Sequence, residues 1–111
     1  MEILQQKEKN YTLISINGDL DASSAILLDT EINDIIAKSE RTIIVDFLNL
    51  DYIASAGVGV FLAHLDEIQE QEIHLVLFGM NERVKSVFEI LGLDALLQIK
   101  NTKEEALATI S

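Results

Sequence analysis

Hydrophobic residues along the chain change repeatedly between a two-residue period and the spacing of a helix. The two-residue period predicts strands at residues 2–7 and 11–17, which a turn at Lys9-Asn10 separates. Residues 18–21 are expected to close the second strand. Further strands are predicted by short aliphatic or β-branched runs at residues 42–47, 73–78 and 96–99.

Helical spacing, with hydrophobic residues three and four positions apart, predicts four helices. The first covers residues 24–38, and Ser23 or Ser24 is expected to cap its start. Another begins after Asn81, a residue that favours helix starts, and Gly92 suits the left-handed backbone at its exit. The expected inward stripes are Leu28, Ile32, Ile35 and Ile36; Val58, Phe61, Leu62, Leu65 and Ile68; Val84, Val87, Phe88 and Leu91; and, in a last helix over residues 103–110, Ala106, Leu107 and Ile110.

The predicted order of elements is β-β-α-β-α-β-α-β-α, in one domain over residues 1–111. Strands that alternate with helices predict a mainly parallel sheet with right-handed crossovers. The expected fold is therefore α/β, an open sheet of about five strands with about four helices, whose first strand is antiparallel at the edge. In such sheets, binding sites lie beyond the carboxyl ends of the strands, where loops meet helix starts.

Composition excludes several classes of function. Nineteen acidic residues against eight basic ones give a net charge of −11, which leaves no basic surface for nucleic acid or an anionic membrane. The absence of cysteine excludes disulfides, thiolate zinc sites and a cysteine nucleophile. No apolar run approaches the ~20 residues of a membrane span, and no targeting segment is recognisable. We therefore expect a cytoplasmic protein without membrane insertion.

The segment over residues 46–60 carries the most chemical information. It is expected to connect a buried strand to a helix, and it places Ser55 before Gly57 and Gly59 among small neighbours. A serine at a helix start is most often a cap. A nucleophile elbow would need glycine at position 53, a dinucleotide fingerprint would need glycine at position 62, and a P-loop would need a lysine after the glycines. The spacing thus predicts no catalytic motif in this segment.

Histidines and aspartates offer weaker alternatives. His64 and His74 belong to no metal-binding pattern, and both are expected to be ordinary partly buried or surface residues. Asp46 or Asp51 suggests a phosphoacceptor aspartate of the receiver-domain kind, but the acidic pair and the late lysine of those domains are missing. Loop and cap roles are favoured for Asp21 and Asp51, and neither a metal nor a cofactor is expected.

Three segments in the right order resemble the STAS domain family, and in particular its stand-alone anti-sigma factor antagonists. Residues 18–25, Gly-Asp-Leu-Asp-Ala-Ser-Ser-Ala, are similar to the family's Gly-Asp/Glu-Leu-Asp segment, which has a hydroxyl-bearing residue three positions after the aspartate. Residues 46–60 are similar to its central strand, loop and helix, which carry an Asp-Ser-Ser/Thr-Gly-x-Gly centre. Residues 81–84 and 91–93 are similar to its third helix and the Gly-Leu exit of that helix. The resemblance covers nearly the whole chain.

In that family, a serine of the central loop is phosphorylated by a partner kinase, and the resemblance assigns this role to Ser55. Asp21 and Ser24 match loop positions that lie beside the serine in the family's fold. The partner-binding residues implied by the resemblance are Asp21, Ser24, Ala54, Ser55 and Gly57.

Two positions depart from the family pattern. The family's aspartate before the serine is Ala54 here, and its second hydroxyl-bearing residue is Ala56. Ser55 is therefore the only serine or threonine in this segment. The missing aspartate removes a charge beside it, which affects phosphorylation more than binding.

The resemblance implies an antagonist that binds an anti-sigma factor with serine kinase activity while Ser55 is unphosphorylated. Phosphorylation of Ser55 releases the partner, so transcription is regulated indirectly, and a phosphoserine phosphatase is a further expected partner. The protein would be a substrate of its kinase and not an enzyme. The alternative is a non-catalytic STAS subunit of a larger assembly, such as a signalling scaffold or the cytoplasmic side of a transporter.

Overall fold

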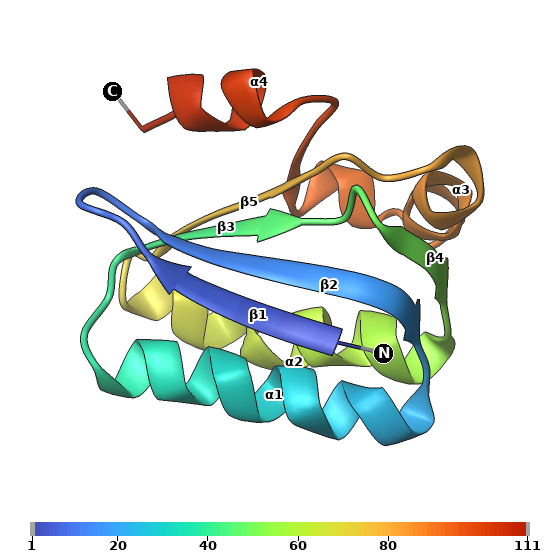
Figure 1. Cartoon of the computed structure of the whole chain (residues 1–111), viewed down its shortest axis with the longest axis horizontal. Helices are drawn as coiled ribbons and strands as arrows, with labels where there is room; N and C mark the ends of the chain where they lie inside the picture. Colours follow the sequence, from blue (N-terminus) through green and yellow to red (C-terminus); the bar gives the residue numbers. More distant parts are fainter. Residues whose placement is uncertain (1, 111) are drawn as a thin grey trace.

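The computed structural model describes residues 2–110 and shows an open sheet with helices on both faces (Figure 1). Four α-helices and a mostly parallel sheet confirm the predicted fold class. None of the helices in the described part of the chain has the length and apolar character needed to cross a membrane. In chain order the elements are β1 (Glu2–Lys7), β2 (Thr12–Leu20), α1 (Ala22–Ala37), β3 (Thr42–Asp46), β4 (Leu50–Ile53), α2 (Ser55–Glu70), β5 (His74–Phe78), α3 (Glu82–Ile90), a 3-10 turn (Leu93–Ala95), β6 (Gln98–Lys100) and α4 (Lys103–Ala108).

The sheet has the strand order β1-β2-β3-β5-β6, and β4 pairs with the end of β2. β1 is antiparallel to β2 at the edge, as predicted, and the remaining pairs are parallel. Parallel pairing brings the carboxyl ends of β2, β4 and β5 to one edge of the sheet. The helices that follow these strands, α1, α2 and α3, therefore begin along that edge (Figure 1).

The main core lies between the sheet and the helices α1, α2 and α3. Phe47, Phe61 and Phe88 pack with ring centroids 5.9–6.3 Å apart, and this cluster joins the end of β3 to α2 and α3. The predicted stripe of α1 is buried throughout. Two residues predicted to face inward are exposed. Leu62 is exposed because Val60 and His64 occupy the inner side of α2. Leu91 is exposed because α3 ends before it.

The strand β4 was not predicted, because Leu50–Ile53 was expected to belong to a loop. It forms because β2 does not end at Gly18 but continues to Leu20, and Gly18 takes a left-handed backbone with a φ of 98° within the strand. A register shift after Gly18 lets β2 pair with β4, with Leu20 opposite Ile53. A four-residue strand with one partner strand is too short to show a clear hydrophobic period.

Smaller differences concern element ends. α1 begins at Ala22, not at residue 24, because Asp21 caps it in place of Ser23 or Ser24. The predicted exit at Gly92 is confirmed by its φ of 73°. The chain then makes a 3-10 turn, which moves the last strand from residues 96–99 to Gln98–Lys100.

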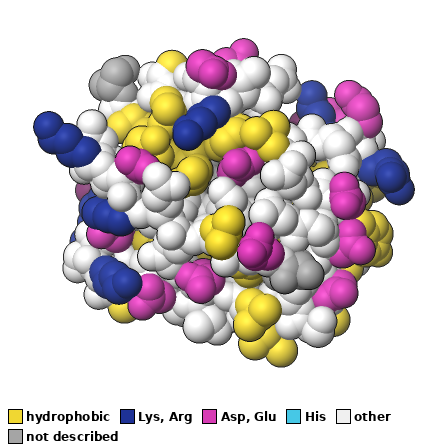
Figure 2. Space-filling view, in the orientation of Figure 1, with side chains coloured by type: hydrophobic (Ala, Val, Ile, Leu, Met, Phe, Trp, Pro, Cys, Tyr) yellow, Lys and Arg dark blue, Asp and Glu magenta, His cyan; other side chains and the backbone are white. Residues whose placement is uncertain are grey.

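The second face of the sheet carries α4 over a smaller cluster, whose members include Leu13, Ile44 and Ala106. Tyr11 and Leu107 pack against this cluster and stay partly exposed. Figure 2 shows hydrophobic side chains gathered between α4 and the strands on this side of the molecule.

Candidate binding site around Ser55

The pairing of β2 with β4 places the starts of α1 and α2 side by side. Leu20, the last residue of β2, lies opposite Ile53, the last residue of β4. The backbone N–H of Ala54 then donates to the carbonyl of Leu20 at 2.9 Å. Asp21 and Ala54, the residues that precede α1 and α2, therefore leave the sheet as neighbours.

Gly57 allows α2 to approach the sheet closely at this point. A methyl group at Gly57 would lie 2.8 Å from Cγ of Leu20 and 3.0 Å from Cγ1 of Ile53, both closer than carbon atoms pack. Both neighbours are buried at the strand ends. Gly57 is therefore required for the close packing of α2 on the ends of β2 and β4.

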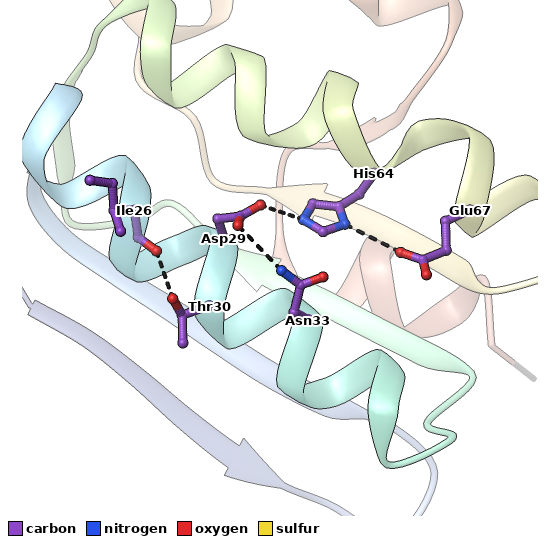
Figure 3. A network of polar contacts seen from close by, with 6 residues as sticks. All are labelled: Ile26, Asp29, Thr30, Asn33, His64 and Glu67. Carbon is purple, nitrogen blue, oxygen red and sulfur yellow. Dashed lines mark hydrogen bonds and ion pairs between the residues drawn. The ribbon is translucent and has the colours of Figure 1, made fainter.

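A buried histidine connects the two helices further along. Nε2 of His64 on α2 lies 2.8 Å from Oδ1 of Asp29 on α1, and its Nδ1 lies 3.5 Å from Oε1 of Glu67 (Figure 3). Asn33 donates to the second oxygen of Asp29 at 3.2 Å. His64 is 6% exposed. It is an ordinary buried residue whose role is to bridge α1 and α2. Because residues nine apart lie on opposite sides of a helix, this ring does not reach Ser55.

Ser55 is the first residue of α2 and not its cap. The cap position belongs to Ala54, whose side chain makes no capping hydrogen bond. The side chain of Ser55 is exposed, and its hydroxyl has no hydrogen-bond partner within residues 2–110. The first N–H groups of a helix lack intrahelical acceptors and carry partial positive charge. The hydroxyl thus lies in solvent at a helix start that favours an anion.

Asp21 organises the start of α1 in a reciprocal capping arrangement. Its carboxylate accepts from the backbone N–H groups of Ser23 and Ser24, both at 3.1 Å, and from the Ser23 hydroxyl at 2.8 Å. The Ser24 hydroxyl oxygen in turn accepts from the Asp21 N–H at 2.8 Å. The bond from the Ser23 hydroxyl, followed by those from Ser24, lowers the pKa of Asp21 to about 2. Asp21 is therefore a charged, fixed cap, which confirms its predicted cap role.

The five residues implied as partner-binding lie together at this edge but differ in depth. Asp21 and Ser55 are exposed, and Ala54 is half-buried. Ser24 and Gly57 are buried. A partner can touch the first three, whereas the other two shape the surface from beneath.

The surface around Ser55 also includes residues that the sequence analysis did not identify. Ser55, Gly59 and Leu62 are spaced four and three residues apart and share the outward stripe of α2. A methyl group at Gly59 would meet no atom within 4 Å, so the stripe is flat there. On α1, Ile26 is 68% exposed, and hydrophobic side chains are visible over this helix at the lower edge of Figure 2. Ile26 lies outside the predicted inward stripe of α1, and a hydrophobic residue in such a position is a sequence signal for an exposed apolar site. Leu62 gave no such signal, because it was expected to face inward.

Of the two aspartates considered as phosphoacceptors, Asp51 lies exposed within β4, and the side chain of Asp46 has other partners. Asp46 accepts from the backbone N–H of Leu48 at 2.8 Å and from the Ser15 hydroxyl at 3.5 Å. Within residues 2–110, no group of three metal-ligating side chains is arranged to hold an ion. This arrangement does not favour a receiver-like site at Asp46.

Comparisons with known proteins agree with this geometry. The STAS domain profile matches residues 2–106. The anti-sigma-B factor antagonist of Listeria monocytogenes is 28% identical over 102 residues, which are 92% of this chain and 90% of that protein. The anti-sigma factor antagonist SpoIIAA in its unphosphorylated form has a TM-score of 0.84 and 24% identity, with 98% of this chain and 96% of that chain covered. The phosphorylated form of the Bacillus protein SpoIIAA has a TM-score of 0.77 and 23% identity, over 99% and 100%. The chain belongs to the STAS domain family.

Proposed function

We propose that this protein is an anti-sigma factor antagonist whose binding is switched by phosphorylation of Ser55. Unphosphorylated, it binds an anti-sigma factor that has serine kinase activity, and a sigma factor is thereby set free. The phosphorylated protein is released, and a phosphoserine phosphatase restores it. The observation that carries this proposal is the exposed, unpaired hydroxyl of Ser55 at the uncapped start of α2.

The surface around Ser55 has the composition of a binding site. The flat stripe at Gly59 lets a partner's backbone approach α2, and Leu62 and Ile26 offer apolar contacts on the two neighbouring helices. Asp21 adds a fixed negative charge beside them. Apolar residues with a few ordered polar groups are typical of the core and rim of protein interfaces.

Phosphorylation can act at this site without unfolding it. A phosphate on Ser55 adds about −1.5 to −2 charges and three acceptor oxygens next to the N–H groups of the helix start. The same group occupies space that a partner fills and adds charge to a protein that already carries −11. Switching binding from nearly complete to nearly absent takes about 5 kcal/mol of differential affinity. Desolvating a doubly charged group at a dry contact supplies an energy of that order.

The described residues around Ser55 favour a role as a substrate and not as a catalyst. His64 faces α1 in its bridge to Asp29, and Nε2 of His74 lies 2.7 Å from the Thr109 hydroxyl on α4. Neither imidazole is placed to remove the proton of Ser55. The partner kinase would therefore supply the base and the phosphate donor.

The five implied partner-binding residues take separate roles in this proposal. Ser55 is the modified residue, and Asp21 and Ala54 contact the partner beside it. Ser24 and Gly57 hold the two helix starts in position, since one closes the cap of α1 and the other lets α2 approach the sheet.

The test is to incubate the protein with ATP and an anti-sigma factor kinase from the same genome, and to map the phosphate by mass spectrometry. We expect one phosphate, on Ser55, and none in Ser55→Ala. The matched control is Ser23→Ala, which removes an exposed hydroxyl at the neighbouring helix start and should be phosphorylated like the wild type. Phosphate at another residue, or none with any such kinase, would contradict the proposal.

A second candidate function is favoured by Ala54. The family's aspartate is missing there, which removes a charge that could orient the hydroxyl or contact the kinase. The protein would then be a non-catalytic subunit of a larger assembly. Recovery of a scaffold or a membrane transporter as the main partner from cells, in place of an anti-sigma factor, would favour this second function.

A further inference from the structure

A cavity of about 230 Å³ lies between β4 and α3, next to the start of α2. Figure 1 shows β4 running alongside α3 and leading directly into α2. The cavity is lined by Tyr52, Ile53, Arg83, Val84 and Val87. Since Ile53 is two residues before Ser55, the cavity lies close to the start of α2.

The floor of the cavity is apolar and its walls are held in place. Ile53 and Val84 are buried, and Val87 is partly buried against the main core. The Asn81 side chain fixes α3 to β4, because its Nδ2 donates to the carbonyls of Leu50 and Asp51 at 3.1 and 3.3 Å. Its Oδ1 accepts from the N–H of Val84 at 2.8 Å. A site that is already ordered loses little entropy when a ligand binds.

The rim of the cavity carries two exposed residues of the types that dominate binding energy in protein interfaces. Tyr52 is 53% exposed, and Arg83 is exposed. In a chain with a net charge of −11, the side chain of Arg83 makes no ion pair or hydrogen bond within residues 2–110. Tyrosine and arginine are enriched among residues whose loss costs the most affinity. The guanidinium is therefore available for a carboxylate from another molecule.

We propose that this cavity is a docking site for a segment of the anti-sigma factor partner that carries an aliphatic side chain next to an aspartate or glutamate. The aliphatic group fills the space over Ile53, Val84 and Val87, and the carboxylate pairs with Arg83 while Tyr52 packs over both. The inference rests on the proposed function, because it takes the same partner. It adds a second contact that does not involve the phosphorylated serine.

The charges near the cavity favour a single carboxylate over a broad acidic or phosphate-rich ligand. The neighbours of the two rim residues in sequence, Asp51 and Glu82, are exposed acids. They repel a ligand with spread negative charge, whereas a single carboxylate can still pair with the Arg83 guanidinium. Such placement contributes specificity as well as affinity.

The experiment measures the affinity of the unphosphorylated protein for the anti-sigma factor kinase of the same genome by isothermal titration calorimetry. We expect Arg83→Ala and Tyr52→Ala each to weaken binding at least 10-fold, and Arg83→Lys to recover only part of the loss. The wild-type affinity should also fall more steeply with salt than that of Arg83→Ala. The matched control is Arg41→Ala, which removes the chain's other arginine, before β3 at the opposite edge of the sheet, and should bind within about twofold of wild type. Thermal melts of the four variants check that each is folded.

Two results would overturn the inference and leave the proposed function standing. One is wild-type affinity in both Arg83→Ala and Tyr52→Ala while phosphorylation of Ser55 abolishes binding. The other is an effect of Arg83→Ala on the phosphorylated protein alone, which would assign the arginine to the protein's own phosphate. If no such kinase binds the unmodified wild type, both the inference and the proposed function fail.

Discussion

Two helices begin side by side at the carboxyl edge of the sheet, α1 after β2 and α2 after β4. At α1, the Asp21 carboxylate accepts two backbone N–H groups and two serine hydroxyls, and the Ser24 hydroxyl oxygen closes the box. At α2, Ala54 makes no side-chain cap, and the Ser55 hydroxyl points into solvent. One start satisfies its polar groups internally, while the other leaves them for water or a partner.

The difference separates stability from function within one small surface. A missing N-cap typically costs a helix about 1 kcal/mol, so α2 gives up stability that α1 has. In exchange, its N–H groups and the neighbouring hydroxyl remain available to a phosphate or to a partner. The rigid start of α1 and the close packing at Gly57 hold this open start in a fixed position.

The largest expected effect is at the glycine that positions the open start. Gly57→Ala should lower the free energy of unfolding by roughly 1–3 kcal/mol, because the added methyl group overlaps Leu20 in the core. Gly59→Ala is the control: it meets open space and should raise the free energy of unfolding by up to about 1 kcal/mol. Denaturant unfolding measures both. Similar changes in the two variants would show that the contact at Gly57 is not tight.

The second effect compares the two helix starts directly. Asp21→Ala should lower the melting temperature by a few degrees, because several donors lose their acceptor. Ser55→Ala should leave the melting temperature nearly unchanged, since its hydroxyl has no partner to lose. Asp21→Asn retains a capping oxygen and should fall between them. Equal destabilisation by Asp21→Ala and Ser55→Ala would contradict the contrast between the helix starts.

A smaller effect is expected from giving α2 the cap that it lacks. Ala54→Asp should raise the free energy of unfolding by about 1 kcal/mol, because the new carboxylate can accept from the first N–H groups of the helix. The matched control is Ala54→Leu, which adds bulk without an acceptor. Absence of a gain in the aspartate variant would mean that these N–H groups are already satisfied.

The smallest effect concerns how the stability that the Asp21 cap contributes depends on pH. The pKa of Asp21 is lowered from 3.8 to about 2 in the folded protein, so its charged form stabilises the fold above about pH 4. That contribution is lost as the pH falls from about 4 towards 2, where the unfolded chain binds the proton first. The difference in stability between wild type and Asp21→Asn should therefore shrink over this range. A constant difference would show that the carboxylate is not stabilised by its hydrogen bonds.

Much of the fold could be predicted because long helices and buried strands carry strong hydrophobic periods. The stripe of Leu28, Ile32 and Ile35, the cap at Asn81 and the exit at Gly92 were all predicted correctly. Asp21 was expected to have a loop or cap role, but the cap of the first helix was assigned to Ser23 or Ser24. Serine and aspartate are equally good caps, so composition alone does not select between them.

The candidate site was harder to predict because its geometry depends on β4. Without this strand, no argument from the sequence places the start of α1 beside that of α2, and only the family resemblance brought Asp21 near Ser55. The exposed position Leu62, which was expected to face inward, shows the same limit. A hydrophobic residue does not reveal which face of a helix the sheet covers until the packing partners are known.

The most direct test of the switch is the affinity of the anti-sigma factor kinase for the unmodified protein and for the same protein phosphorylated on Ser55. We predict that phosphorylation weakens binding several thousand-fold, which corresponds to about 5 kcal/mol. The start of α1 and the overall fold should be unchanged in both forms. Equal affinity of the two forms would contradict the account, because the open start of α2 would then not control partner binding.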